Sequence, residues 1–282
     1  MSKAKITKAA MESYKEYLIE EEKSNATIEK YMRDILAFYE FLPRDKSFSK
    51  KEALDYKNHI LQDHKESSVN SMIISLNKFF AYIGAHDCKL KLIRVQRDTF
   101  AETRKELSKA EYKRLLNAAK DKDNERLYML LQAICSTGIR VSEHKYITVE
   151  SLYEGRASVH NKGKTRYILF PAKLRKMLLK YCSKNNLTTG SVFVTRGGKP
   201  MDRSNIWKSM KALCKMAKVD EAKVFPHNLR HLFAFTYYSL QKDVLRLADI
   251  LGHSSVETTR MYTKISLIDC ERSLGKMGLV GI

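Results

Sequence analysis

The fold of the second half of the chain is decided by one stretch, Leu127-Tyr-Met-Leu-Leu-Gln-Ala-Ile-Cys-Ser-Thr-Gly-Ile-Arg-Val-Ser-Glu143. Its first nine residues are almost wholly apolar, which favours a buried helix. Gly138 is expected to end that helix, and Arg140 follows with apolar neighbours on both sides. This pattern is typical of an ordinary helix corner, where Arg140 pairs with Glu143 at the surface. Taken alone, the stretch favours this ordinary corner.

The charge of the whole chain favours an anionic partner. The 282 residues carry 52 Lys+Arg and 32 Asp+Glu, a net charge of +20. Residues 1–100 contain 18 basic and 15 acidic side chains and residues 101–282 contain 34 and 17, so the surplus lies in the second part. Nucleic acid is the first candidate and an anionic membrane surface the second. No run of about 18 apolar residues is present, so no membrane span is predicted.

The first 85 residues are predicted to form a bundle of four amphipathic helices. Ser49 and Glu52 form a possible capping box that opens one of the helices. Apolar residues recur at helical spacing in three others: Met11, Tyr14 and Leu18; Ile28, Tyr31, Ile35, Phe38 and Leu42; Val69, Ile73, Leu76, Phe80 and Ile83. Residues 86–106 lose this periodicity and are interpreted as a basic linker.

A second unit is predicted over residues 107–282, beginning with a capping box of Ser108 and Glu111. It is mostly helical, with strands expected at Ala157–His160 and Tyr167–Phe170 around a basic turn at Asn161–Arg166. A further short strand is expected at Ser191–Thr195. The fold class is therefore mainly α with a small β-sheet, a four-helix domain followed by an α+β domain.

Two more polar segments need an explanation. In Phe225-Pro-His-Asn-Leu-Arg-His-Leu-Phe-Ala234, His227 and Arg230 lie on one helix face, where they can clamp a phosphate. A structural histidine and a snorkelling arginine are the alternative. In Ala248–Tyr262, Gly252 is predicted to end a helix and the residues from Ser254 to Glu257 to cap the next. Tyr262 is expected at the far end of that second helix, and a half-buried packing role is the alternative for it.

The order of these segments resembles the tyrosine recombinase family, which includes phage integrases and Xer proteins. The resemblance implies a helical, SAM-like core-binding domain at 1–85 and a catalytic domain at 107–282. It implies that Arg140 and Arg230 bind the scissile phosphate, with His227 and His253 as the active-site histidines. Tyr262 would be the nucleophile and Glu143 structural support. A lysine belongs at the hairpin turn, where Lys162 is the first choice and Lys164 the alternative. His231 matches the family pattern without being counted as catalytic.

The implied reaction cuts and rejoins duplex DNA at a specific recombination site through a 3′-phosphotyrosine. It needs no metal, no ATP and no other cofactor. The implied assembly is a homotetramer on DNA, with a possible accessory or partner recombinase and a C-terminal tail able to dock on a neighbour. Five scattered cysteines favour a reducing cytoplasm. The alternatives are relaxation of DNA by a type IB topoisomerase and a non-catalytic DNA-binding protein on the same fold.

Overall fold

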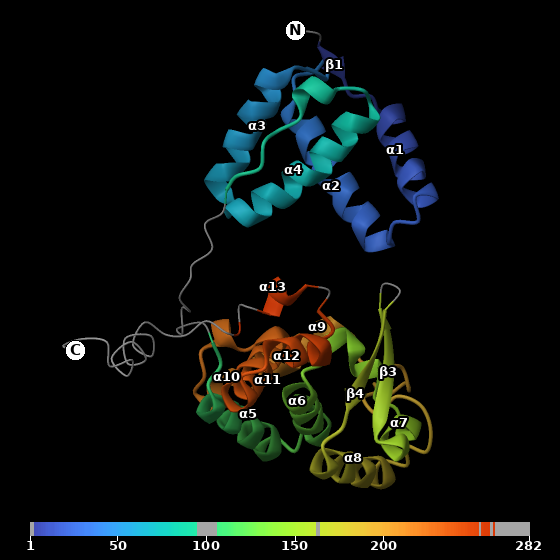
Figure 1. The fold of residues 1–282 in the computed structure, drawn as a ribbon, viewed down its shortest axis with the longest axis vertical. Helices are drawn as coiled ribbons and strands as arrows, with labels where there is room; N and C mark the ends of the chain where they lie inside the picture. The colour runs from blue at the N-terminus through green and yellow to red at the C-terminus, as the bar shows by residue number, and fades with distance from the viewer. Residues whose placement is uncertain (1–2, 95–105, 162–163, 254, 260–261, 263–282) are drawn as a thin grey trace, which may run out of the picture. The chain divides into compact units, whose positions relative to one another are not determined.

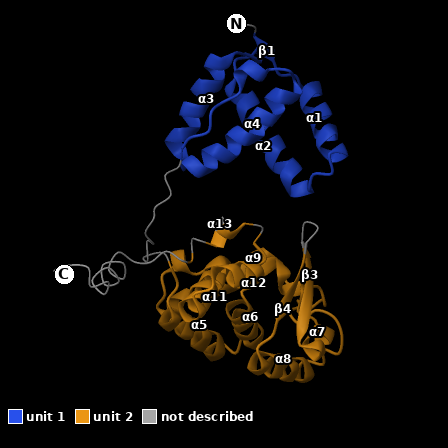
Figure 2. Ribbon diagram, viewed as in Figure 1, with its two compact units in different colours: residues 1–97 blue, residues 98–282 orange. Residues whose placement is uncertain are grey.

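The computed structural model describes residues 3–94, 106–161, 164–253, 255–259 and 262. The chain divides into two compact units, Met1–Arg97 and Asp98–Ile282, as Figure 2 shows. Within the described residues no helix is both long and apolar enough to cross a lipid bilayer. Cys88, Cys135, Cys182 and Cys214 are free thiols.

The first unit contains the four predicted helices (Figure 1): α1 (Lys8–Glu20), α2 (Asn25–Phe41), α3 (Lys50–Asp63) and α4 (Glu66–Tyr82). Two strands of two residues each, β1 (Ala4–Lys5) before α1 and β2 (Ser47–Phe48) before α3, form a small antiparallel pair. The predicted capping box is present, because Ser49 and Glu52 bond each other's backbone at the start of α3. Buried aromatic rings from α2, β2 and α4 meet edge to face in the core.

The described part of the predicted linker lies against this first unit. A 3₁₀ turn, η1 (His86–Cys88), follows α4, and Leu90 is buried in the core of the unit. Two asparagines of α4 hold the extended backbone beyond it. Asn77 bonds both the N–H and the C=O of Leu90, and Asn70 does the same for Ile93, at 2.7–2.9 Å. The packed core of the first unit therefore continues beyond α4 to Ile93.

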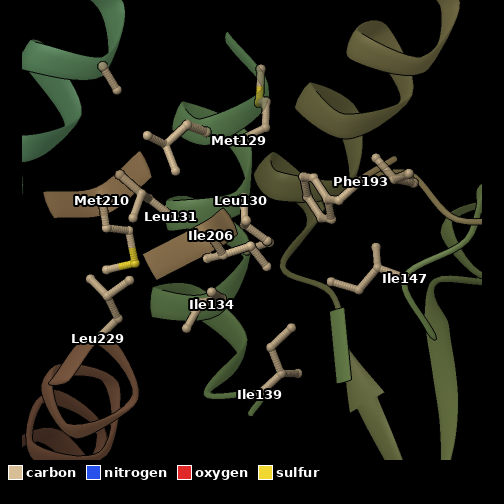
Figure 3. Close-up of a cluster of buried hydrophobic side chains, with 14 of the residues drawn as sticks. Met129, Leu130, Leu131, Ile134, Ile139, Ile147, Phe193, Ile206, Met210 and Leu229 are labelled. Carbon is tan, nitrogen blue, oxygen red and sulfur yellow. The ribbon is translucent and has the colours of Figure 1, made fainter. Parts of the chain in front are cut away.

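The second unit is built around α6 (Glu125–Thr137), the apolar helix of the opening stretch. Figure 3 shows leucines of α6 between side chains of α9, of α11 and of the segment that carries Phe193. Around it lie α5 (Lys109–Asp121), η3 (Val141–Tyr146), α7 (Val149–Glu154), α8 (Ala172–Lys184), α9 (Arg203–Lys211), α10 (Cys214–Ala217), η4 (Glu221–Lys223), α11 (Pro226–Gln241), α12 (Val244–Leu251) and α13 (Val256–Thr259). The mainly α fold class with a small sheet is confirmed.

The sheet of the second unit is a two-stranded antiparallel hairpin. Strands β3 (Arg156–Asn161) and β4 (Lys164–Leu169) pair from Arg156 with Leu169 to Asn161 with Lys164, so they are longer than predicted. The expected strand at Ser191–Thr195 is wrong. That segment makes only isolated bridges, of Ser191 with Thr148 and of Val194 with Pro200. Val192 and Phe193 are both buried, so the segment lacks the alternation of a strand with one exposed face.

Candidate active site

The corner after α6 places Arg140 inside the second unit. Gly138 ends α6 with φ +66°, and a Cβ there would lie 2.4 Å from the Phe233 ring, so only glycine fits without strain. The backbone N–H of Arg140 donates to Glu143 at 2.7 Å, and the guanidinium donates to the other carboxylate oxygen at 3.0 Å. Glu143 is 3% exposed, so the expected surface pair is instead an anchor with a buried carboxylate.

Arg230 is brought to the same corner by α11, which begins at Pro226. Its side chain is 1% exposed, so the alternative of a snorkelling arginine is wrong. The guanidinium donates to Gly138 O at 2.6 Å and to Leu251 O at 2.7 Å. Burial, followed by the charge of Arg140, lowers the pKa of Arg230 to about 10, and the group remains a cation at neutral pH.

The C-terminal end of α12 receives three arginines. Its successive carbonyls accept one bond each: Ile250 O from Arg166 at 2.8 Å, Leu251 O from Arg230 at 2.7 Å and Gly252 O from Arg140 at 3.3 Å. The last carbonyls of a helix lack partners inside the helix and form the negative end of its dipole. This end therefore gathers three like charges that would otherwise repel one another.

His253 follows these carbonyls and is fixed through both ring nitrogens. Nε2 lies 3.0 Å from an Arg230 nitrogen, and Nδ1 lies 2.8 Å from the hydroxyl of the buried Thr259. A guanidinium only donates, so Nε2 accepts and the single proton of the neutral ring lies on Nδ1. Burial and then the charges of Arg230, Arg140 and Arg166 lower the pKa of His253 to about 4, which agrees with a neutral ring.

Tyr262 completes the cluster. It is 5% exposed, its ring lies nearly parallel to that of His253 at 6.2 Å between centroids, and His231 meets it edge on at 5.0 Å. Burial raises the pKa of the Tyr262 hydroxyl, while the charge and hydrogen bond of Arg230 act in the opposite direction. The tyrosine is therefore buried more deeply than the half-buried packing role implied, in a small hydrophobic cluster next to the charged Arg230.

A pocket of about 450 Å³ opens beside the cluster. Its lining includes three of the predicted site residues, Arg140, His227 and Arg230, and three residues of α9, Arg203, Ser204 and Trp207. Burial, and then the charges of Arg230, Arg140 and Arg203, lower the pKa of His227 below its ordinary value. A pocket lined by three arginines, one of them next to a buried tyrosine, suits an anionic ester.

The structure thus brings together Arg140, His227, Arg230, His253 and Tyr262, with Glu143 beneath them. Lys162 lies outside the described residues. Lys164 begins β4, but its side chain is outside the described part of the chain. No group of three His, Cys, Asp or Glu side chains within the described ranges is arranged to hold a metal ion.

Sequence reasoning missed Arg166, Thr259 and the α9 residues that line the pocket. Arg166 was counted only as a cation of the basic turn, although its guanidinium also bonds Glu143. Thr259 orients His253 from α13. The only sequence signal for Arg166 was its place at the end of the basic turn expected to carry the lysine. Nothing in the sequence showed that it turns inward.

Comparison with known proteins identifies the class. The model of the phage integrase family matches residues 105–267, and that of the phage integrase N-terminal SAM-like domain matches residues 11–85. Tyrosine recombinase XerC of Lacticaseibacillus casei is 28% identical over 285 residues, which cover 90% of this chain and 93% of that protein. Tyrosine recombinase XerA of Pyrococcus furiosus is 26% identical over 290 residues, covering 99% and 98%.

Solved structures agree with the sequence matches. The crystal structure of XerA recombinase covers 97% of this chain and 99% of its own, with a TM-score of 0.54 and 25% identity. A lambda integrase (75–356) dimer bound to a COC′ core site covers 91% and 94%, with a TM-score of 0.73; at 19% identity it shows the fold alone. The chain belongs to the phage integrase family. It is a tyrosine recombinase, an enzyme of site-specific DNA recombination.

Proposed function

We propose that the cluster at the end of α12 cleaves and rejoins one DNA strand with Tyr262 as nucleophile. The observation that carries the proposal is the placement of the buried Tyr262 next to Arg230, which lines the pocket together with Arg140 and His227. A phosphodiester is an anion that repels an incoming phenolate. Two guanidiniums on its non-bridging oxygens neutralise that charge and stabilise the pentavalent transition state.

The step balances without an external reagent. The Tyr262 oxygen bonds to phosphorus as the bond from phosphorus to the 5′ oxygen breaks, leaving a 3′-phosphotyrosine and a 5′-hydroxyl. His227, which burial keeps neutral, takes part in moving the proton from the tyrosine. Lys162, or Lys164 in its place, protonates the leaving oxygen. Attack by a 5′-hydroxyl reverses each step, so rejoining needs neither ATP nor metal.

The remaining residues have supporting roles in this proposal. His253 hydrogen-bonds the phosphate once Nε2 is released from Arg230. Glu143 holds Arg140 and does not react. Residues 1–85 grip DNA as the core-binding domain, 86–106 connect the domains, and 107–282 carry the chemistry.

The partner is double-stranded DNA with a specific site, in a homotetramer with or without a partner recombinase. Among the structural relatives, XerH is bound to its difH substrate and a lambda integrase tetramer to a Holliday junction. These titles describe those proteins, and the tetramer is an inference for this chain. The free thiols favour the cytoplasm as the site of action.

Covalent capture tests the nucleophile. The protein is incubated with fragmented genomic DNA of its source and is then denatured. The DNA that stays covalently attached to the protein is sequenced to obtain the site. A nicked duplex of that site then traps the intermediate. Wild type is expected to form the adduct and Tyr262→Phe to form none. Tyr238→Phe, in the same small hydrophobic cluster, is the matched control and keeps the adduct.

Two outcomes would contradict the proposal. An adduct formed by Tyr262→Phe moves the nucleophile elsewhere, and no adduct with wild type on any captured site refutes the cleavage chemistry. A plasmid assay separates the related activities. Recombinant product from two sites is expected, whereas relaxation of any supercoiled plasmid without such product would indicate a topoisomerase.

A further inference from the structure

Arg166 occupies a position in the second unit that the proposed chemistry does not use. It lies on β4, two residues after Lys164, and its side chain points inward with 12% exposed. One terminal nitrogen donates to Ile250 O at 2.8 Å and the other to the Glu143 carboxylate. Arg166 is not one of the residues that line the pocket, and the hydrogen bonds of its two terminal nitrogens are made to protein groups.

The position of this arginine is enforced by a close approach. Gly252 has φ +63°, and a Cβ there would lie 2.3 Å from Arg166 Cδ and 2.6 Å from its Nε. The stem of Arg166 therefore crosses directly over the backbone between Leu251 and His253. Arg166 Nε is buried without a hydrogen-bond partner among the described residues. An unsatisfied buried donor is unfavourable, so this site is poorly explained by stability alone.

The bonds of Arg166 continue through Glu143 to Arg140. Both Arg166 and the backbone N–H of Arg140 donate to the same carboxylate oxygen, and the Arg140 guanidinium donates to the other oxygen. Because all of these are charge-assisted or short, the carboxylate has one orientation only while Arg166 is present. Without Arg166, one side of that oxygen loses its donor and the carboxylate is able to turn.

We infer that Arg166 is a positioning residue for DNA cleavage, acting on Arg140 through Glu143 while fixing the hairpin to the end of α12. This inference rests on the proposed function, because it assigns Arg140 to the scissile phosphate. It joins three segments distant in sequence: the corner at 138–143, the β3–β4 hairpin and the turn that leads to His253. A shift of one of them moves a group that must meet the phosphate.

The test measures cleavage and DNA binding separately, on the nicked duplex captured with wild type. Since a displacement of 1 Å in an active site costs about 100-fold in rate, we expect Arg166→Met to slow single-turnover cleavage by about 30-fold or more. Binding, measured in the Tyr262→Phe background, stays within about 3-fold because Arg166 does not face the pocket. Arg166→Lys keeps the charge with one donor head and is intermediate.

The matched control lies on the partner strand. Arg156 on β3 is exposed and covers the Tyr167 ring at 5.0 Å, so Arg156→Met removes the same side chain from the same hairpin. It is expected to leave both cleavage and binding within about 3-fold of wild type, the usual range for surface substitutions. A loss equal to that of Arg166→Met would show a general hairpin effect and overturn the inference.

A double-mutant cycle distinguishes positioning from a separate structural role. If Arg166 acts through Glu143, the double variant with Glu143→Gln and Arg166→Met cleaves at a rate within about 3-fold of that of the slower single variant. Effects that multiply would overturn the inference, as would normal cleavage by Arg166→Met or equal losses of cleavage and binding. Folding is checked by thermal melting, and Arg166→Lys carries the test if the methionine variant does not fold. Absence of any wild-type adduct would refute the proposed function instead.

Discussion

Lowering the pH from 7.5 to 5.5 is expected to destabilise the second unit through two histidines. Burial, and then the charges of neighbouring arginines and histidines, lower the pKa of both His231 and His253 to about 4. In the unfolded chain each titrates near 6.5. Between these values the unfolded state binds more protons than the native state, so stability is lost as the pH falls from about 6.5 toward 4.

The magnitude follows from the two pKa values. At pH 5.5 an unfolded histidine of pKa 6.5 is mostly protonated while a native one of pKa 4 is almost wholly neutral. The linkage relation then gives about 1.3 kcal/mol for each histidine between pH 7.5 and 5.5, and about 2.7 kcal/mol for both. Carboxylates, with ordinary pKa values near 4, contribute little in this window.

Urea unfolding at the two pH values measures the effect. Trp207, on α9, is the single tryptophan of the chain, so its fluorescence reports on the second unit alone. His231→Gln removes one of these groups and is expected to reduce the pH dependence by about 1.3 kcal/mol, whereas His86→Gln in the first unit is a control that leaves it unchanged. A free energy of unfolding that changes by less than about 0.5 kcal/mol in wild type would refute the reasoning. An unaltered dependence in His231→Gln would exclude that histidine.

Three further outcomes are expected. Gly138→Ala should lower the melting temperature more than Gly190→Ala, because both have positive φ but only the first places a Cβ against the Phe233 ring; equal losses would contradict the steric argument. Lys162→Ala should reduce the cleavage rate far more than Lys164→Ala, and the reverse ranking would transfer the role of acid to Lys164. The logarithm of the DNA association constant should fall steeply and linearly with the logarithm of the salt concentration, as titrations from 50 to 200 mM would show. A flat response would contradict phosphate binding by the basic surplus.

Local signals in the sequence were sufficient for most of the fold. Helical periodicity and capping boxes depend on residues three or four apart, so the four helices of the first unit, α6 and the starts of α3 and α5 were predicted correctly. The strand expected at Ser191–Thr195 does not form, and two successive side chains of the segment, Val192 and Phe193, are buried. Their burial comes from the core around α6, which no local pattern records.

The site was predictable as a set of residues but not as a geometry. Motif order located Arg140, Arg230 and His253. The backbone carbonyls that accept hydrogen bonds from the two arginines could not be predicted, because every residue has a carbonyl and the sequence does not mark which ones are used. The inward turn of Arg166 was equally hidden, since its bonds to Ile250 and Glu143 span 84 and 23 residues. Long-range contacts of this kind depend on packing, not on local sequence.

The charge of the cluster connects the acid sensitivity with the proposed chemistry. Three guanidiniums and one carboxylate, Glu143, leave two uncompensated positive charges, and helix α12 offers only partial charges against them. Those cations help to keep His231 and His253 neutral in the free protein. A phosphodiester entering the pocket brings a negative charge that favours protonated rings, so it must raise their pKa. DNA binding below pH 6.5 should therefore take up protons, and bound DNA should oppose the loss of stability at pH 5.5.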